Sequence, residues 1–296
     1  MRYGVVLPQN EGMRDPIAAR DFAQSVEDLG FDHLIGFDHV VGADPENRPE
    51  GWRTQYSHRT FVHEPLVLFA HLGAVTRTLE FSSAIIILPQ RQTVLFAKQA
   101  AEVDYLLGGR LRLGLGIGWN TLEFESLNED FHNRGRRVVE QVQVLRALWT
   151  KEVVDFKGRW HTIDRAGVNP MPVQRPIPLW MGGYNENVLK RTAALADGWM
   201  PLFKPGEESS REMTQRLLGY VKDAGRQNDF GIEGRIVLTQ ASAADGPRSS
   251  PAIDDWAKEL DDWRALGATH IGVSTGTSPN RAEHIALLER FKPLMK

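Results

Sequence analysis

Short apolar runs and longer stretches with helical spacing alternate along this chain. Apolar runs of about four to eight residues are typical of buried strands, and apolar positions three and four residues apart are typical of amphipathic helices. The apolar runs predict strands at residues 3–7, 33–37, 79–88, 111–117, 178–181, 199–203, 235–240 and 270–274. Helices are predicted to follow them at residues 15–29, 65–76, 94–107, 136–149, 185–196, 208–224, 253–266 and 281–291.

Eight strand–helix units in 296 residues predict a (β/α)8 TIM barrel, an α/β fold in which parallel strands close on themselves. A doubly wound open sheet is the alternative, but it rarely needs so many units. We expect residues 1–296 to form a single barrel domain. Two insertions interrupt the repeat: a long loop after the second strand, 40–62, and an irregular or hairpin segment after the fourth, 151–177. We expect both to lie over the active site.

The unit between residues 178 and 201 suggests a binding site. Its strand ends at Gly182 and Gly183, and a helix begins close behind, at Asn185. A helix N-terminus presents unpaired backbone N–H groups and a positive dipole, and glycine lets an anion come close to the backbone. This pattern predicts a phosphate site between two parallel strands. The alternative is that the glycine pair simply ends the strand.

Composition excludes several classes of function. Hydrophobic residues make up 42% of the chain and charged residues 25%, which is enough to bury a large core. The net charge of −3 and the pI of about 6.3 argue against a nucleic-acid or anionic-membrane partner. Cysteine is absent, which excludes disulfides, thiolate catalysis and cysteine-bound metals. No apolar run approaches the ~20 residues of a membrane span, and we expect a cytoplasmic protein.

The residues at the C-terminal ends of the predicted strands are expected to form the active site. They are mostly glycine, small and aromatic residues. No histidine clusters there with carboxylates at metal-ligand spacing, so we expect no metal site. The run GLGIGWN lacks the glycine order of a dinucleotide-binding fold, and no serine lies in a G-x-S-x-G motif. A flat, mostly apolar cofactor held by a phosphate suits such a lining.

Several long motifs, in the same order, resemble the luciferase-like monooxygenase superfamily. They are GFDHLIGFDHV, IILPQR followed by TVLFAKQAAEVDYLLGGRLRLGLGIGWNTLEFESL, FHNRGRRVVEQVQVLRALW and PLWMGGYNENVLKRTAALADGWMP. The resemblance is strong over residues 3–203 and weak in the last third, and it is closest to the coenzyme F420-dependent oxidoreductases. It implies a TIM barrel that binds FMN or the 5-deazaflavin coenzyme F420 at the strand ends, commonly as a homodimer.

The resemblance also implies roles for single residues. His39 falls where a histidine of the family often lines the reactive face of the cofactor ring, with a supporting hydrogen-bonding role as the alternative. The implied cofactor-binding residues are Asp38, Ser83, Ala84, Ile85, Gly116, Gly118, Trp119, Asn120, Arg134, Gly182, Gly183 and Tyr184. Residues 83–85 fall where the family often has a non-proline cis peptide against the ring. For Arg134 a solvated basic face is equally compatible, and Glu123 is interpreted as a helix cap.

The two insertions are where the family varies, so they are expected to contact a small-molecule substrate. The candidate residues are Trp52, Tyr56 and Arg59 in the loop, with Phe156, Trp160 and His161 in the insertion. Aromatic and basic groups fit a planar or anionic substrate, although loop aromatics also pack within lids.

Three functional classes remain open: a hydride-transferring oxidoreductase that uses coenzyme F420, an FMN-dependent monooxygenase that uses reduced flavin and dioxygen, and a non-catalytic flavin-binding barrel. The open loops argue against the third. Cations that could meet the acidic tail of coenzyme F420 favour the first, and they are Arg53, Arg59, Arg91, Lys190, Arg191 and Lys204. The helices at 94–107 and 136–149 carry apolar residues beyond one core-facing stripe, which predicts a homodimer.

Overall fold

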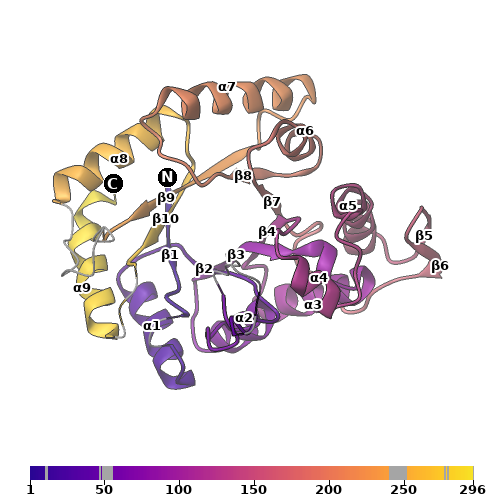
Figure 1. Cartoon of the computed structure of the whole chain (residues 1–296), viewed down its shortest axis with the longest axis horizontal. Helices are drawn as coiled ribbons and strands as arrows, with labels where there is room; N and C mark the ends of the chain where they lie inside the picture. Colours follow the sequence, from indigo (N-terminus) through magenta and orange to yellow (C-terminus); the bar gives the residue numbers. More distant parts are fainter. Residues whose placement is uncertain are drawn as a thin grey trace.

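Eight parallel strands close into a barrel, in the order β1-β10-β9-β8-β7-β4-β3-β2. The computed structural model describes residues 1–10, 13–46, 48, 56–239, 252–276, 278 and 280–295. Helices surround the strands as an outer layer (Figure 1). The predicted TIM barrel is therefore confirmed.

The barrel strands alternate with helices along most of the chain. The strands are β1 (Arg2–Val6), β2 (His33–Gly36), β3 (Glu80–Ile87), β4 (Leu111–Gly116), β7 (Leu179–Gly182), β8 (Gly198–Met200), β9 (Gly231–Val237) and β10 (His270–Ser274). The helices are α1 (Pro16–Asp28), α2 (Pro65–Gly73), α3 (Thr93–Leu106), α4 (Thr121–Ser126), α5 (Arg134–Thr150), α6 (Glu186–Leu195), α7 (Glu208–Asp223), α8 (Ile253–Ala265) and α9 (Arg281–Phe291), with short 3-10 turns at Leu88–Gln90 and Lys292–Leu294.

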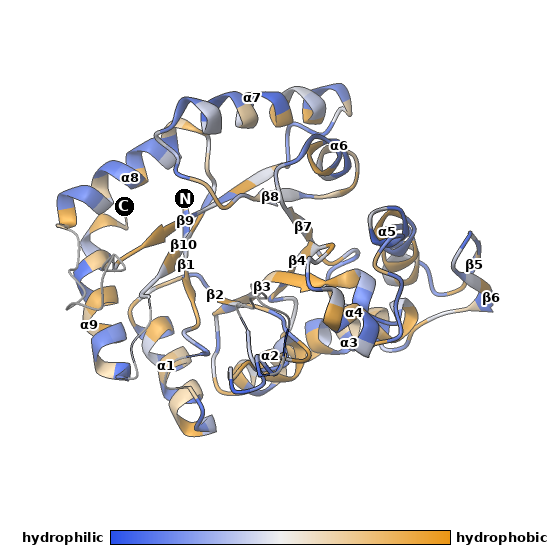
Figure 2. Ribbon diagram, in the orientation of Figure 1, coloured by the Kyte–Doolittle hydropathy of each residue, from blue (hydrophilic) through white to orange (hydrophobic). Residues whose placement is uncertain are grey.

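Helix starts and buried faces follow the sequence pattern closely. Asp15 caps α1 by accepting a hydrogen bond from the Ile17 N–H at 2.9 Å, which satisfies one of the donors that a helix start leaves unpaired. The outer faces of α7 and α8 are hydrophilic and their inner faces hydrophobic (Figure 2). Among the described helices, none has both the length and the apolar character needed to cross a membrane.

The seventh barrel strand lies earlier than the sequence pattern predicts. It was expected at residues 235–240, but β9 begins at Gly231 and ends at Val237, and residue 240 lies outside the described residues. The segment before residue 235 looks like a polar turn because Glu233 interrupts its apolar run. In the barrel Glu233 has charged partners on other strands, so its burial is compensated there.

A buried chain of charges crosses the barrel interior. Arg112 on β4 donates one hydrogen bond to Glu80 on β3 at 2.9 Å and another to Glu233 on β9 at 2.7 Å. Glu233 also contacts the Nε2 atom of His33 on β2 at 2.6 Å. Burial opposes the ionisation of Glu233, but Arg112 and His33 outweigh it and hold the pKa of this carboxyl well below its usual range. Four strands are thereby tied together by charged groups.

Residues 151–177 contain an antiparallel hairpin, β5 (Val154–Lys157) and β6 (Thr162–Ala166). Its turn is fixed by Glu140 on α5, which accepts hydrogen bonds at 2.8 Å from the backbone N–H groups of Arg159, Trp160 and His161. The hairpin lies beyond α5, on the side facing away from the barrel (Figure 1). The expected position over the active site is therefore not what the structure shows, since the carboxylate of Glu140 draws the hairpin turn to the helix layer.

We predict that protonation of His270 couples stability to pH. Burial, with help from Arg112 and His33, lowers the pKa of His270 to about 3, whereas an unfolded histidine has a pKa of ~6.5. Between these values the unfolded chain binds the proton and the folded chain does not. The stabilisation is therefore complete above pH ~6.5 and is lost as the pH falls toward the folded pKa.

Urea unfolding measured between pH 6.5 and pH 5 should show the free energy of unfolding falling in the wild type and falling less in His270→Gln. Unfolded carboxyl groups titrate mainly below pH ~4.5, so they contribute little in this window. The pKa of His284 is also lowered, chiefly by burial, and comparison of the two proteins removes its contribution. Parallel pH profiles for both proteins would contradict the prediction.

Candidate functional site

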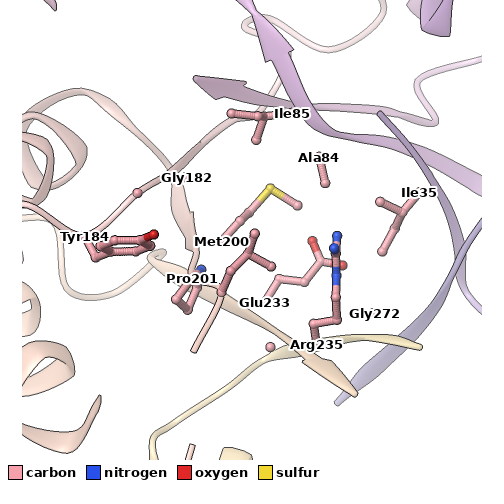
Figure 3. Close-up of a pocket in the computed structure, with 13 residues that line it drawn as sticks. Ile35, Ala84, Ile85, Gly182, Tyr184, Met200, Pro201, Glu233, Arg235 and Gly272 are labelled. Atoms are coloured by element: carbon pink, nitrogen blue, oxygen red, sulfur yellow. The ribbon is translucent and has the colours of Figure 1, made fainter. Parts of the chain in front are cut away.

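A cavity of about 100 Å³ opens among the strands where β7 and β8 end. Residues of β2, β3, β7, β8, β9 and β10 contribute to its wall (Figure 3). The lining residues are Ile35, Ala84, Ile85, Gly182, Gly183, Tyr184, Met200, Pro201, Leu202, Glu233, Gly234, Arg235 and Gly272. Five of the implied cofactor-binding residues are therefore brought together in one place: Ala84, Ile85, Gly182, Gly183 and Tyr184.

An irregularity in β3 shapes one wall of the cavity. The Ala84–Ile85 peptide bond is cis, and the pairing register with β4 shifts between Ser83 and Ile86. Ala84 and Ile85 face the cavity, whereas Ser83 is buried and donates a hydrogen bond to the Gly114 carbonyl at 2.9 Å. A side chain at Gly116 would collide with Ile85. Ser83 and Gly116 thus support the irregular segment and do not line the cavity.

The glycine turn after β7 forms another wall. Gly183 has a φ of +105°, which glycine adopts readily and other residues rarely do. The indole Nε1 of Trp199 donates to the Gly183 carbonyl at 2.8 Å and anchors the turn. Asn185 caps α6 by accepting from the Val188 N–H at 3.0 Å. Because this donor is taken and Glu186 adds a carboxylate to the first helical turn, an anion here would meet the backbone of Gly183 and Tyr184 first.

Asp38 has a supporting position at the end of β2. Its carboxylate is buried and accepts a hydrogen bond from the Arg91 guanidinium at 2.7 Å and one from the Ile87 N–H at 3.1 Å. Arg91 also pairs with Glu64 at 2.8 Å. Asp38 therefore ties the end of β2 to the end of β3, just beyond the cis peptide, and does not line the cavity.

His39 lies in a hydrogen-bonded cluster next to the cavity. Its Nδ1 is 3.0 Å from a carboxylate oxygen of Glu123, and this oxygen also accepts from the Val40 N–H at 3.0 Å. Gln90 donates to the other oxygen of Glu123 at 3.3 Å. Burial opposes ionisation of Glu123, but its contact with His39 and the hydrogen bonds from Val40 and Gln90 lower the pKa of this carboxyl. An ionised Glu123 only accepts, so the proton of a neutral His39 is assigned to Nδ1 and Nε2 remains available.

The position of Glu123 corrects its interpretation as a helix cap. Its carboxylate reaches the β2 loop and does not cap α4, whose preceding residue, Asn120, also makes no side-chain cap. The sequence shows Glu123 near a helix start but cannot show that the β2 loop passes over it. Glu123 is thus a positioning residue for His39.

Tyr56 connects the His39 cluster to the cavity. Its ring lies 3.6 Å from the imidazole, measured between centroids, and the Trp119 ring lies 6.4 Å from it on the same measure. The Tyr56 phenol is close enough to Arg235, in the cavity wall, to influence the pKa of that guanidinium. Neither His39 nor Tyr56 is among the residues that line the cavity.

The other implied residues lie outside the cavity. Arg134 stacks on the ring of Phe131 and donates to the Gly118 carbonyl at 3.2 Å, so it braces the loop after β4. Trp119 is exposed on this loop. The Arg59 side chain is 76% exposed and faces Glu46 at 3.6 Å. The implied substrate residue Trp52 lies outside the described residues.

Sequence reasoning missed the charged part of the cavity wall, Glu233 and Arg235 on β9. These residues alternate with Ile232 and Ile236, and the two isoleucines are buried in the core. Alternation with a period of two is the signature of a strand with two different faces. That signal could have identified both residues as facing the barrel interior. Within the described residues, no three histidine, aspartate or glutamate side chains are grouped to hold a metal ion.

Comparisons with known proteins agree with this architecture. An uncharacterised protein of Mycobacterium tuberculosis is 35% identical over 198 residues, which cover 67% of each chain. An FMNH(2)-dependent dimethylsulfone monooxygenase of Pseudomonas fluorescens is 28% identical over 182 residues, 60% of this chain and 46% of that protein. The solved structure of an F420-dependent secondary alcohol dehydrogenase in complex with an F420-acetone adduct is similar with a TM-score of 0.80 at 17% identity, over 100% of this chain and 99% of that one.

These relatives include proteins named for each of the two cofactors. At 17% identity the dehydrogenase shows a common fold alone. The family model for luciferase-like monooxygenases matches residues 1–250, which is most of the chain. The chain belongs to the luciferase-like monooxygenase family.

Proposed function

We propose that this protein is an oxidoreductase that binds coenzyme F420 with its ring against the cavity wall and transfers hydride to or from a small organic substrate. The observation that carries the proposal is the convergence of Ala84, Ile85 and the turn at residues 182–184 around one cavity. The residues fit such a cofactor, because the wall is largely apolar and the glycines leave backbone accessible. When bound, the deazaflavin supplies or accepts the hydride.

The protein's own contribution to the reaction centres on His39. Glu123 holds the Nδ1 side of the imidazole, which leaves Nε2 to donate to or accept from a reacting group. Histidine exchanges protons near neutral pH more readily than other side chains. We propose that His39 stabilises charge on the substrate or supplies its proton, with Tyr56 packed against its ring.

An FMN-dependent monooxygenase that uses reduced flavin and dioxygen is the second candidate. It is favoured by the named activity of the Pseudomonas relative. The cations expected to favour coenzyme F420 are also largely engaged, since Arg91 pairs with Asp38 and Glu64, and Lys190 pairs with Glu186 at 3.3 Å. Arg59 faces Glu46, Arg53 lies outside the described residues, and within the described residues Arg191 and Lys204 form no ion pair. The His39–Glu123 pair argues against a non-catalytic flavin-binding barrel, because such a protein needs no histidine oriented for proton transfer.

Titration of the purified protein with coenzyme F420 and with FMN, followed by fluorescence, separates the two candidates. We expect saturable binding of coenzyme F420 and, when reduced FMN is added, no oxygen consumption beyond the spontaneous oxidation of free reduced FMN. Tight FMN binding with oxygen consumption, and no binding of the deazaflavin, would instead assign the monooxygenase reaction, because 5-deazaflavins lack the nitrogen at position 5 and activate dioxygen poorly.

A pair of glycine variants tests the cofactor site. In Gly182→Ala the added Cβ would lie 3.4 Å from Ile85 and 3.6 Å from the Met200 carbonyl, which are ordinary contacts. This variant should fold normally and bind the cofactor more weakly, because the added methyl group lies at the cavity wall, where the cofactor would approach the backbone. Gly183→Val combines a positive φ with a Cβ at 3.1 Å from Val188, so we expect it also to unfold at a lower temperature. Unchanged cofactor affinity in a folded Gly182→Ala protein would rule out this site.

His39→Ala should lower turnover by about 10²-fold, the lower end of general acid–base catalysis, with cofactor affinity changed much less. Glu123→Gln should lower turnover by a smaller factor and displace the pH–rate profile, because the amide no longer favours the same histidine tautomer. His71→Ala, at an exposed position on α2, is the matched control. Steady-state kinetics would contradict the assignment if His39→Ala kept wild-type turnover.

The proposed homodimer is expected to use α2 and α3. Leu95 and Leu106 on α3 are 57% and 61% exposed, and Val67 on the neighbouring α2 is 70% exposed. Leu95 and Leu106 are about three turns apart and so share one face. The α5 helix, also expected at the interface, has its apolar side chains buried or partly buried against the core. The proposed dimer interface therefore lies on α2 and α3 and does not include α5.

Light scattering at micromolar concentration should show a dimer for the wild type and a monomer for Leu95→Glu, because a buried unpaired carboxylate disfavours association. Val153→Glu, at a 58% exposed apolar residue before the hairpin, is the control and should remain dimeric. A wild-type protein that is monomeric under these conditions would refute the proposed interface.

A further inference from the structure

Arg235 places a positive charge in the cavity wall, and no carboxylate of the described residues forms an ion pair with it. Its side chain extends from β9 toward the open space of the cavity (Figure 3). Among the residues that the structure describes, no carboxylate forms an ion pair or hydrogen bond with its guanidinium. This distinguishes it from Arg112, which also faces the barrel interior and is bound to two carboxylates.

The nearest acidic residue, Glu233, already has both oxygens engaged. One oxygen is 2.6 Å from His33 Nε2, and the other accepts from Arg112 at 2.7 Å. The Tyr56 phenol is also near Arg235, but a phenol carries no charge near neutral pH. Gly272 on β10 offers no partner either, because it has no side chain. A Cβ at this position would lie 2.7 Å from Ile35, so a side chain would not fit there.

A cation in such a wall is unfavourable until an anion binds. Burial lowers the pKa of Arg235, against the opposing effects of Glu233 and Tyr56, yet a guanidinium remains protonated in proteins. Its planar donors match the two oxygens of a carboxylate, or those of a sulfonate, better than any neutral group. An arginine at this position therefore contributes more to ligand recognition than to stability.

The guanidinium is separate from the glycine turn. Figure 3 shows Tyr184 and Arg235 on different sides of the cavity. An anion at Arg235 would consequently be a second charged group, distinct from a cofactor phosphate at residues 182–184. It would lie on the side of the cavity that includes β9 and β10.

We propose that Arg235 binds an anionic group of the substrate, so that the enzyme acts on small organic carboxylates or sulfonates. This inference rests on the proposed function of the same cavity. Another source of the same chemistry is the negatively charged edge of a reduced cofactor ring, and the experiment below separates the two.

The test compares matched anionic and neutral probes: acetate with acetamide, and methanesulfonate with dimethyl sulfone. Their effect on the unfolding midpoint is measured at constant ionic strength, with and without saturating cofactor. The proteins are the wild type, Arg235→Met, Arg235→Lys and the control Arg211→Met, which alters an exposed arginine on α7. Binding of oxidised and reduced cofactor is measured on the same proteins.

The wild type and Arg211→Met should bind the anions in preference to the neutral probes. Arg235→Met should lose about 10- to 100-fold in anion affinity, the range of one charge-assisted pair, and Arg235→Lys should be intermediate. Without a bound anion, Arg235→Met should unfold at the same temperature as the wild type or higher, because it removes a partly buried charge that has no carboxylate partner among the described residues. A merely structural arginine would instead give a destabilised variant.

Equal anion affinity in the wild type and Arg235→Met would overturn the inference. So would a loss of affinity for the reduced cofactor with anion binding unchanged, because the guanidinium would then serve the cofactor. Failure of the proposed function has a different signature, since coenzyme F420 would then bind to none of the four proteins, whatever their affinity for the anions.

Discussion

The pairing of Arg112 with Glu80 and Glu233 is the interaction on which the interior of this barrel depends. Breaking a buried pair by removing one partner typically destabilises a protein by about 3 to 5 kcal/mol, because the other charge is left uncompensated. Here one guanidinium satisfies two carboxylates from strands on either side of the barrel, and His33 completes the set. The same contacts engage both oxygens of Glu233, and Arg235, two residues along β9, faces the cavity with no carboxylate partner among the described residues. Stability and recognition are thus divided between neighbouring residues of one strand.

The site is held in place by contacts between strand ends that are distant in sequence. Asp38 at the end of β2 binds the backbone at Ile87, and so fixes β3 next to its irregular segment. Glu123, after β4, orients His39 and fixes the backbone at Val40. Trp199 on β8 anchors the carbonyl of Gly183. The irregular segment of β3, His39 and the glycine turn are therefore each supported by a polar contact from a neighbouring unit, which favours a preformed site.

The periodic parts of the fold could be predicted from sequence, because buried strands and amphipathic helices carry local signals. The cap at Asp15 and the helix from Glu186 are examples, and the eight-unit count led to the correct barrel. Which residues pair with one another across the barrel could not be predicted. The start of β9 was missed because Glu233 is polar in sequence and is compensated only by Arg112 and His33 in space.

The candidate site likewise has parts that the sequence predicted and parts that it did not. The glycine turn was predicted from its strand–glycine–helix pattern and the segment at Ala84–Ile85 from a resemblance to family motifs, and they meet in one cavity. Glu123 was assigned to a cap because its distance from His39 in the chain hides their 3.0 Å contact. The hairpin was expected above the site, but Glu140 holds it against α5. In both of the last two cases, the tertiary contacts of one charged side chain, Glu123 or Glu140, decided the position that the structure shows.

A crystal structure of the protein grown with saturating coenzyme F420, and a second grown with FMN, would test the central claim most directly. The account predicts the cofactor ring against Ala84 and Ile85 and its phosphate at the backbone of Gly183 and Tyr184. Cofactor density elsewhere on the protein, or no density with either compound, would contradict it.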